Sequence, residues 1–151
     1  MQSLTDRLAG LAFFQRFGAK ALEGVVARGA WFTLTGGSAL FVESSPSDQL
    51  YFVIAGRLIV VRGRDEVIGY IRSGEPVGEM SFLSGEAHSK SVYALRDTEI
   101  LALDRPDAEY LLDEMADFAS AAARSIVIRA RHPAASFRRA SPRVFALIAS
   151  S

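Results

Sequence analysis

Short apolar runs dominate the middle of the chain, between Trp31 and Leu103. They are rich in Val, Ile, Phe and Tyr, and stretches of Gly, Pro, Ser and Asp separate them. The runs read AWFTLT, ALFVES, LYFVIA, RLIVVR, EVIGYI, SVYALR and EILALD. Many short strands at regular spacing are typical of antiparallel sandwiches and barrels. We therefore predict a mainly β fold, with a hairpin from Leu50 to Arg62 that turns at Gly56.

Helical periodicity flanks this strand-rich region on both sides. Residues 1–30 predict two short helices, and Gly29 is the expected stop of the second one. After the strands, Asp104 fits the N-cap of a helix and Pro106 fits its first turn. A further helix is predicted from about Asp117 to Arg131, stopping before the His-Pro pair that follows.

The end of the chain has a different character. Residues 133–142, PAASFRRASP, predict a linker, and the apolar run RVFALIA that follows predicts one more buried strand. This strand has no evident place in the predicted sheet, so two interpretations stay open. It either begins a following domain, or it folds back onto the strand core or is disordered. The predicted organisation is N-terminal helices at 1–30, a strand core at 31–104, C-terminal helices at 105–132, and a linker with the start of a following domain at 133–151.

Composition indicates the size of the domain and its cellular compartment, but it says little about function. Half of the 151 residues are apolar, which suits one globular domain with a real core, and the formal net charge is zero. The absence of cysteine excludes disulfides and thiolate metal sites and fits a reducing compartment. No apolar run approaches the roughly 18 residues that span a bilayer, and the start lacks the order of a signal peptide. We therefore predict a cytoplasmic protein.

The stretch GEMSFLSGEAHSKSVYAL, residues 78–95, carries the candidate site. Glu79 to Leu83 can form about one helical turn, whose start presents unpaired N–H groups to an anion such as phosphate. Gly78 would let a ligand approach the backbone closely. Glu79 is anionic and cannot bind phosphate, but its carboxylate can accept hydrogen bonds from sugar hydroxyls. A nucleotide site needs both features, although a Gly-Glu helix start is common by itself.

The order of these residues resembles the phosphate-binding cassette of the cyclic nucleotide-binding domain family. That cassette runs Gly-Glu, a short apolar turn, a loop, an Arg with a small residue after it, and a strand containing Val. The earlier stretch LTGGSALFVESSPSDQLYFVIAGRLIVV also resembles the family's strands, and the resemblance covers roughly residues 10–130. It implies a double-stranded β-helix jelly roll of eight strands with flanking N- and C-terminal helices. It also implies a pocket for cAMP or cGMP between the cassette and the roll.

The resemblance implies the residues of that pocket as well. Glu79 would accept the ribose 2′-hydroxyl, while cassette N–H groups and the small residue after the Arg position would hold the cyclic phosphate. The ligand-binding residues implied in this way are Gly78, Glu79, Met80, Ser81, His88 and Ser89.

His88 occupies the position of the family's phosphate-binding arginine. A histidine with an ordinary pKa of about 6.5 is mostly neutral at pH 7 and lacks the forked donors of arginine. Losing one charge-assisted hydrogen bond costs about 1.5–3 kcal/mol, and Lys90 is the nearest other cation in the sequence. Two interpretations stay open: a weak or pH-sensitive nucleotide sensor, or a domain that keeps the fold without the ligand and acts as an interaction or autoinhibitory domain.

Other segments are similar to one subgroup, the modules ahead of patatin-like phospholipase domains of the neuropathy target esterase type. These segments are GEPVGEM with its later SGE, YALRDTEILAL, and SPRVFALI at 141–148. The resemblance implies a regulatory domain, not an enzyme, that controls an attached or partner phospholipase domain C-terminal to it. Membrane contact would then arise only through that downstream domain. A second copy of this chain, forming a homodimer, is a further candidate partner.

Catalysis and DNA binding are weaker interpretations. Cupin-type metal chemistry needs clustered histidines, and the chain has only His88 and His132, so no metal is expected. Gly36-Gly37-Ser38 lacks the closing glycine of a nucleophile elbow. The stretch after Asp117 has six arginines and no acid, which indicates a solvated helix face or a surface for an acidic partner, membrane or nucleic acid. The 20 residues after Arg131 are too few for a helix-turn-helix, so DNA is not an expected partner.

Overall fold

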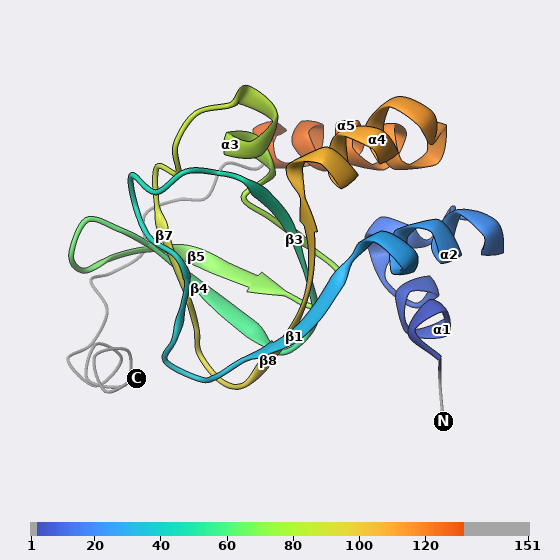
Figure 1. Ribbon diagram of the computed structural model, residues 1–151. Coiled ribbons are helices and arrows are strands. Elements are labelled where there is room, and N and C mark those ends of the chain that lie inside the picture. The colour runs from blue at the N-terminus through green and yellow to red at the C-terminus, as the bar shows by residue number, and fades with distance from the viewer. Residues whose placement is uncertain (1–2, 132–151) are drawn as a thin grey trace.

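The computed structural model describes residues 3–131, and its centre is a roll of two four-stranded antiparallel sheets (Figure 1). One sheet has the strand order β1-β8-β3-β6, and the other has the order β2-β7-β4-β5. The strands are β1 Ala30–Leu34, β2 Ala39–Phe41, β3 Gln49–Ala55, β4 Arg57–Arg62, β5 Glu66–Arg72, β6 Pro76–Val77, β7 Ser91–Ala94 and β8 Thr98–Asp104. The seven apolar runs predicted as strands in the middle of the chain are strands, and the mainly β jelly roll with flanking helices is confirmed. The predicted hairpin from Leu50 to Arg62 is wrong. The chain does turn at Gly56, but this turn carries it from one sheet to the other, so β3 pairs with β6 and β8 while β4 pairs with β5 and β7.

Strand β6 is the one strand of residues 3–131 that the sequence pattern did not predict. It spans only two residues, and one of them is a proline, so it carries no alternation that a pattern could reveal. It pairs with Tyr51 and Phe52 of β3, and the cassette helix follows directly after it. This short pairing therefore fixes where the candidate site begins relative to the roll.

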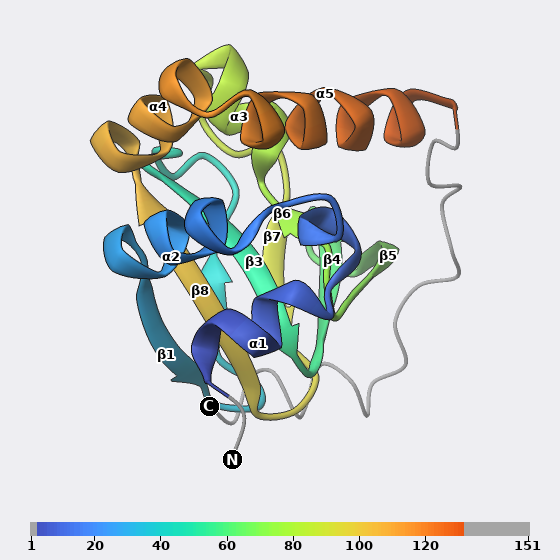
Figure 2. The same ribbon diagram turned by 90° about the vertical axis from the view of Figure 1, so that its right-hand side faces the viewer.

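Helices cover the roll on one side and close it at one end (Figure 2). They are α1 Leu4–Ala9, the 3₁₀ helix η1 Ala12–Phe14, α2 Ala19–Arg28, α3 Glu79–Ser84, α4 Arg105–Glu114 and α5 Ala116–Arg131. The two predicted N-terminal helices are α1 and α2, and η1 lies between them. Asp104 caps α4 by accepting a hydrogen bond from the Asp107 N–H, as predicted, and Gly29 ends α2.

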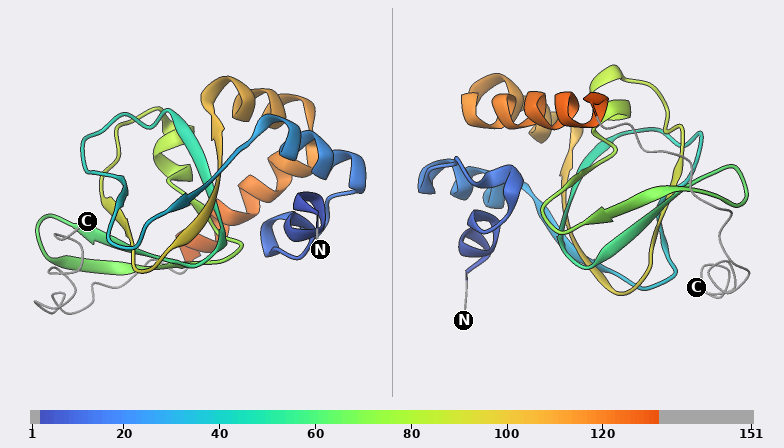
Figure 3. Two further views of the ribbon diagram at one scale, coloured as in Figure 1. Left: turned by 60° about the horizontal axis from the view of Figure 1, so that its bottom comes forward. Right: turned by 180° about the vertical axis from the view of Figure 1, so that it is seen from behind.

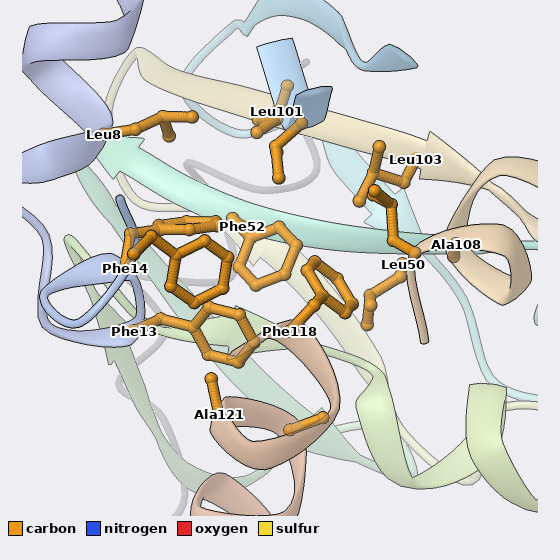
Figure 4. Packing of buried hydrophobic residues seen from close by; sticks show 14 of the residues in the cluster. Leu8, Phe13, Phe14, Leu50, Phe52, Leu101, Leu103, Ala108, Phe118 and Ala121 are labelled. Atoms are coloured by element: carbon orange, nitrogen blue, oxygen red, sulfur yellow. The ribbon is translucent and has the colours of Figure 1, made fainter. Parts of the chain in front are cut away.

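An aromatic cluster joins these helices to the sheet (Figure 4). Phe13 and Phe14 of η1 pack against Phe52 of β3, with ring centroids 4.8 and 5.1 Å apart. Phe118 of α5 packs against Phe13 at 5.6 Å. Burying each ring contributes about 1.5–3 kcal/mol, which fixes the first half of α5 on η1 and β3. The helix then runs across the roll, where it contacts α3 (Figure 3).

A second apolar core fills the space between the two sheets. Its buried members are Val53, Leu58, Ile71, Val77, Val92, Ala94 and Ile100. Phe41 and Tyr51 are partly buried at its margin, with ring centroids 6.0 Å apart. The inner core thus extends to the end of the roll at which the cassette lies.

Some sequence predictions concern parts of the chain that the structure does not describe. The linker at 133–142, the last apolar run and His132 lie outside the described residues. Within residues 3–131, none of the helices is long and apolar enough to cross a membrane.

Candidate functional site

A small cavity of about 110 Å³ lies between α3, the start of β7, and α5. The six residues predicted to bind a ligand all line it: Gly78, Glu79, Met80, Ser81, His88 and Ser89. Apolar side chains from the inner core and its margin complete the wall: Phe41, Val60, Ile71, Val77 and Val92. The structure therefore brings the whole predicted set together at one place.

Gly78 sets the entry into α3. It adopts the left-handed conformation with φ of 75°, which disfavours a side chain. A Cβ at this position would lie 3.0 Å from Cε1 of His88 and 3.3 Å from Cε2 of Phe41. No side chain caps the start of α3, so its first-turn N–H groups are not bonded by a capping residue. The glycine thus keeps the backbone close to His88 and leaves these donors for a ligand.

Glu79 is the first residue of α3, and its side chain is turned into the cavity with only 3% of its surface exposed. Burial raises the pKa of this carboxyl above its ordinary value, and Glu75 adds to the effect, while Arg129 and a backbone hydrogen bond oppose it. A carboxylate kept out of water in this way needs donors, which makes it a candidate ligand-binding group.

Arg129, near the end of α5, approaches this carboxylate. Its Nε lies 2.8 Å from Oε1 of Glu79, yet no N–H in residues 3–131 is aligned with that oxygen for a hydrogen bond. The guanidinium instead donates from Nη2 to the Pro76 carbonyl at 2.9 Å, and it lies 3.9 Å from the carboxylate of Glu75. Arg129 therefore supplies charge to Glu79 without satisfying its oxygen.

His88 forms an inner wall of the cavity and has only 5% of its surface exposed. Its imidazole stacks on Phe41, with ring centroids 3.5 Å apart and planes 8° from parallel. Its backbone bonds the loop before β3, donating to the Ser45 carbonyl at 3.0 Å and accepting from the Ser44 N–H at 2.8 Å. Burial lowers the pKa of His88, and the charge of Asp48 opposes this only in part. The imidazole is therefore neutral at pH 7.

Two cations of residues 3–131 line the cavity, and the sequence analysis indicates only one of them. Lys90, the nearest other cation in the sequence, does line the cavity. Its Nζ lies 3.4 Å from Oγ of Ser89. Arg129 was not singled out from the sequence. The sequence signal for it is the acid-free arginine run after Asp117, which indicates a solvated face or a surface for an acidic partner, membrane or nucleic acid.

Arg105, the first residue of α4, holds α3 in place. Its Nη2 donates to the Phe82 carbonyl at 3.1 Å and to the Ser47 carbonyl at 2.7 Å. The guanidinium also lies 4.1 Å from the centroid of the Phe82 ring, within cation–π distance. Arg105 thus links the start of α4 to α3 and to the loop that carries Ser47.

The sequence profile of the cyclic nucleotide-binding domain family matches residues 31–115. The chain belongs to this family. The crystal structure of the catabolite activator protein of Thermus thermophilus has a TM-score of 0.72 at 26% identity, covering 79% of this chain and 58% of that protein. The structure described as Sp-2Cl-cAMPS bound to PKAR CBD2 has a TM-score of 0.71 at 17% identity, covering 84% of each chain. This second likeness concerns the fold alone.

Sequence relatives confirm the resemblance to the NTE type. Lysophospholipase NTE1 of Phaeosphaeria nodorum is 34% identical over 74 residues, which are 46% of this chain and 5% of that protein. An uncharacterised NTE family protein of Mycobacterium tuberculosis is 29% identical over 113 residues, which are 74% of this chain and 19% of that protein. The chain therefore spans less than a fifth of the length of either relative.

No group of three or more side chains that could hold a metal ion occurs within residues 3–131. The cavity beside α3 offers a different chemistry: a buried carboxylate, backbone donors, hydroxyls from Ser81 and Ser89, and an apolar wall. Such a set can bind a polar ligand that carries both hydroxyl donors and an anionic group.

Proposed function

We propose that this chain is a regulatory module that binds a cyclic nucleotide, cAMP or cGMP, and controls an attached or partner effector domain. The effector that the NTE-type relatives favour is a patatin-like phospholipase or esterase, and the module itself performs no catalytic step. The observation that carries the proposal is the carboxylate of Glu79. It is buried beside the other cassette residues, and no donor within residues 3–131 is aligned with its Oε1.

Ligand roles follow from the chemistry of each group. Glu79 accepts a hydrogen bond from the ribose 2′-hydroxyl, which supplies the missing aligned donor. The N–H groups of the first turn of α3 and the hydroxyls of Ser81 and Ser89 hold the cyclic phosphate. His88 contributes at most one donor to the phosphate while it is neutral, so Lys90 and Arg129 are the nearest positive charges.

The cavity is too small for a whole nucleotide while α5 holds its present position. Ligand pockets for small molecules usually measure about 300–1,000 Å³, compared with about 110 Å³ here. Arg129 belongs to the wall, so movement of this arginine with the end of α5 would widen the cavity. Nucleotide binding and the position of α5 are therefore coupled, and α5 leads to the end of the chain where an effector would follow.

A second candidate function is a ligand-free module that acts by interaction or autoinhibition. His88 favours it, because a neutral, stacked imidazole replaces the family's arginine. Arg129 favours it too, because its charge already lies against Glu79. In this alternative, the ion pair is a permanent structural element and the cavity never opens.

Isothermal titration calorimetry with cAMP and with cGMP separates the two. A binder should be stabilised by about 2.7 kcal/mol at a hundred times its dissociation constant, which thermal unfolding would detect independently. Glu79→Gln should weaken binding roughly tenfold or more, because a charged acceptor is lost, while Glu86→Gln in the exposed loop should not. If neither nucleotide binds at millimolar concentration, and His88→Arg restores binding, the ligand-free alternative holds. If His88→Arg does not bind either, the phosphate role given to this position is wrong.

A further inference from the structure

Three arginines surround a second hollow that shares no residue with the cassette cavity. Arg57, Arg72 and Arg96, together called the arginine cluster, line a space of about 360 Å³ with Gly56 and Ser73. The β3–β4 and β7–β8 turns, which carry Gly56 and Arg96, lie at the end of the roll opposite α3 (Figures 1 and 2). No acidic side chain of residues 3–131 lines this hollow.

The fold itself brings the three side chains together. Arg57 and Arg72 are directly opposite each other in the antiparallel pairing of β4 with β5, so they project from the same face. The hydroxyl of Thr98 accepts from the Arg57 N–H at 3.2 Å and donates to the Arg96 carbonyl at 2.8 Å. Gly56 permits this close approach, because a Cβ there would lie 2.5 Å from Oγ1 of Thr98.

Ion pairing within residues 3–131 does not account for these charges. Like charges directly opposite on neighbouring strands destabilise a sheet. No carboxylate of residues 3–131 lies within ion-pair distance of any of the three guanidinium groups. Arg57 is half-buried over the ring of Tyr70 at 5.0 Å, and its Nε is buried without a hydrogen-bond partner in this part of the chain. The neighbouring acid, Asp97, accepts from the Gly36 N–H at 2.8 Å instead.

We propose that the arginine cluster is a binding site for a phosphate group. A guanidinium offers forked donors that match phosphate oxygens, and a tetrahedral dianion can accept from several such forks at once. A carboxylate has only two oxygens and one charge, so it cannot accept forked hydrogen bonds from three guanidinium groups at once. The hydroxyl of Ser73, on the turn after β5, adds a neutral donor to the same hollow.

The phosphate has two sources with the same chemistry, a soluble phosphate compound and a phosphorylated lipid headgroup. Titration of the 151-residue chain with pyrophosphate at low ionic strength, followed by amide NMR shifts at Gly56 and Ser73, tests the soluble source. Flotation with phosphatidylcholine vesicles, with and without phosphatidylinositol 4-phosphate, tests the lipid source. Amide shifts at these two residues distinguish binding at the cluster from binding beside α3.

The variants are chosen on the surface so that folding is retained. Arg72→Gln and Arg96→Gln should each weaken binding roughly tenfold, while Arg64→Gln, which removes an exposed charge from the β4–β5 turn, should leave it unchanged. Pyrophosphate binding that follows this pattern supports a soluble ligand, and binding only to the phosphoinositide vesicles with the same pattern supports a headgroup. Absence of binding to both probes overturns the proposal. An equal loss in Arg64→Gln overturns it as well, because it indicates attraction by overall charge.

Discussion

The contact between Arg129 and Glu79 predicts a measurable coupling energy. The perturbation is a double-mutant cycle of four proteins: the unchanged chain, Arg129→Gln, Glu79→Gln and the double variant. Removing one partner of a fully buried ion pair costs about 3–5 kcal/mol, whereas an exposed pair contributes about 0.2–1 kcal/mol. The Glu79 side chain is 4% exposed and that of Arg129 is 39% exposed, so solvent screens the pair from one side. We therefore expect a coupling energy of about 1–2 kcal/mol.

Urea unfolding at pH 7 provides the four free energies. The hydrogen bond from Arg129 to the Pro76 carbonyl is lost in both variants that lack the arginine, so the cycle cancels it. Arg131→Gln is the matched control, because it removes an exposed arginine from the same helix and should change stability by less than about 0.5 kcal/mol.

The same cycle has a defined pH dependence. Burial raises the pKa of Glu79, so its carboxyl gains a proton at a higher pH than an ordinary glutamate does. The coupling should be fully present while Glu79 is charged and should decline as the pH falls through this raised pKa. A coupling below about 0.3 kcal/mol at pH 7, or one that persists unchanged at pH 4, would refute the assignment of Arg129 as the counter-charge.

Further predictions concern the cassette wall and the aromatic core. Gly78→Ala should lower the free energy of unfolding by about 1–3 kcal/mol more than Gly63→Ala, measured by urea unfolding, because both have positive φ but only Gly78 has neighbours that a Cβ would crowd. Burial lowers the pKa of His88, so its contribution to stability should be fully present above about pH 6.5 and lost as the pH falls through the pKa of the folded state. In His88→Gln, the melting temperature should therefore change less between pH 7 and pH 5 than in the unchanged chain. Phe14→Ala should cost about 3–5 kcal/mol, whereas Phe32→Ala, at a side chain 39% exposed, should cost far less; equal costs would place Phe14 outside the core.

The strands of the roll were predictable because their signals are local. Alternating apolar runs and turn glycines such as Gly56 act within a few residues, and burial in the roll agrees with them. The cassette was predictable for the same reason. The six predicted site residues all fall within residues 78–89, so one helical turn and one loop place them around a single cavity.

Arg129 could not be predicted in this way. Its contact with Glu79 joins positions 50 residues apart, and it depends on the direction of α5 across the roll. That direction is set by the packing of Phe118 on Phe13, a contact between two segments at opposite ends of the described chain. Periodicity identifies the helix and its buried face, but it does not indicate which partner the last turn meets.

Under the proposed function, a nucleotide and Arg129 of α5 compete for the carboxylate of Glu79. A nucleotide that takes the Glu79 carboxylate and displaces the arginine must overcome the coupling energy of the pair. At about 1–2 kcal/mol this lowers its affinity roughly five- to thirtyfold, in addition to the loss that His88 causes. Linkage is reciprocal, so under the proposed function a bound nucleotide would weaken the contact between Arg129 and Glu79 by the same factor. Under this proposal, weak nucleotide binding and displacement of α5 both follow from the same contact. A variant that binds nucleotide more tightly because it lacks Arg129 should then transmit less of that binding to α5.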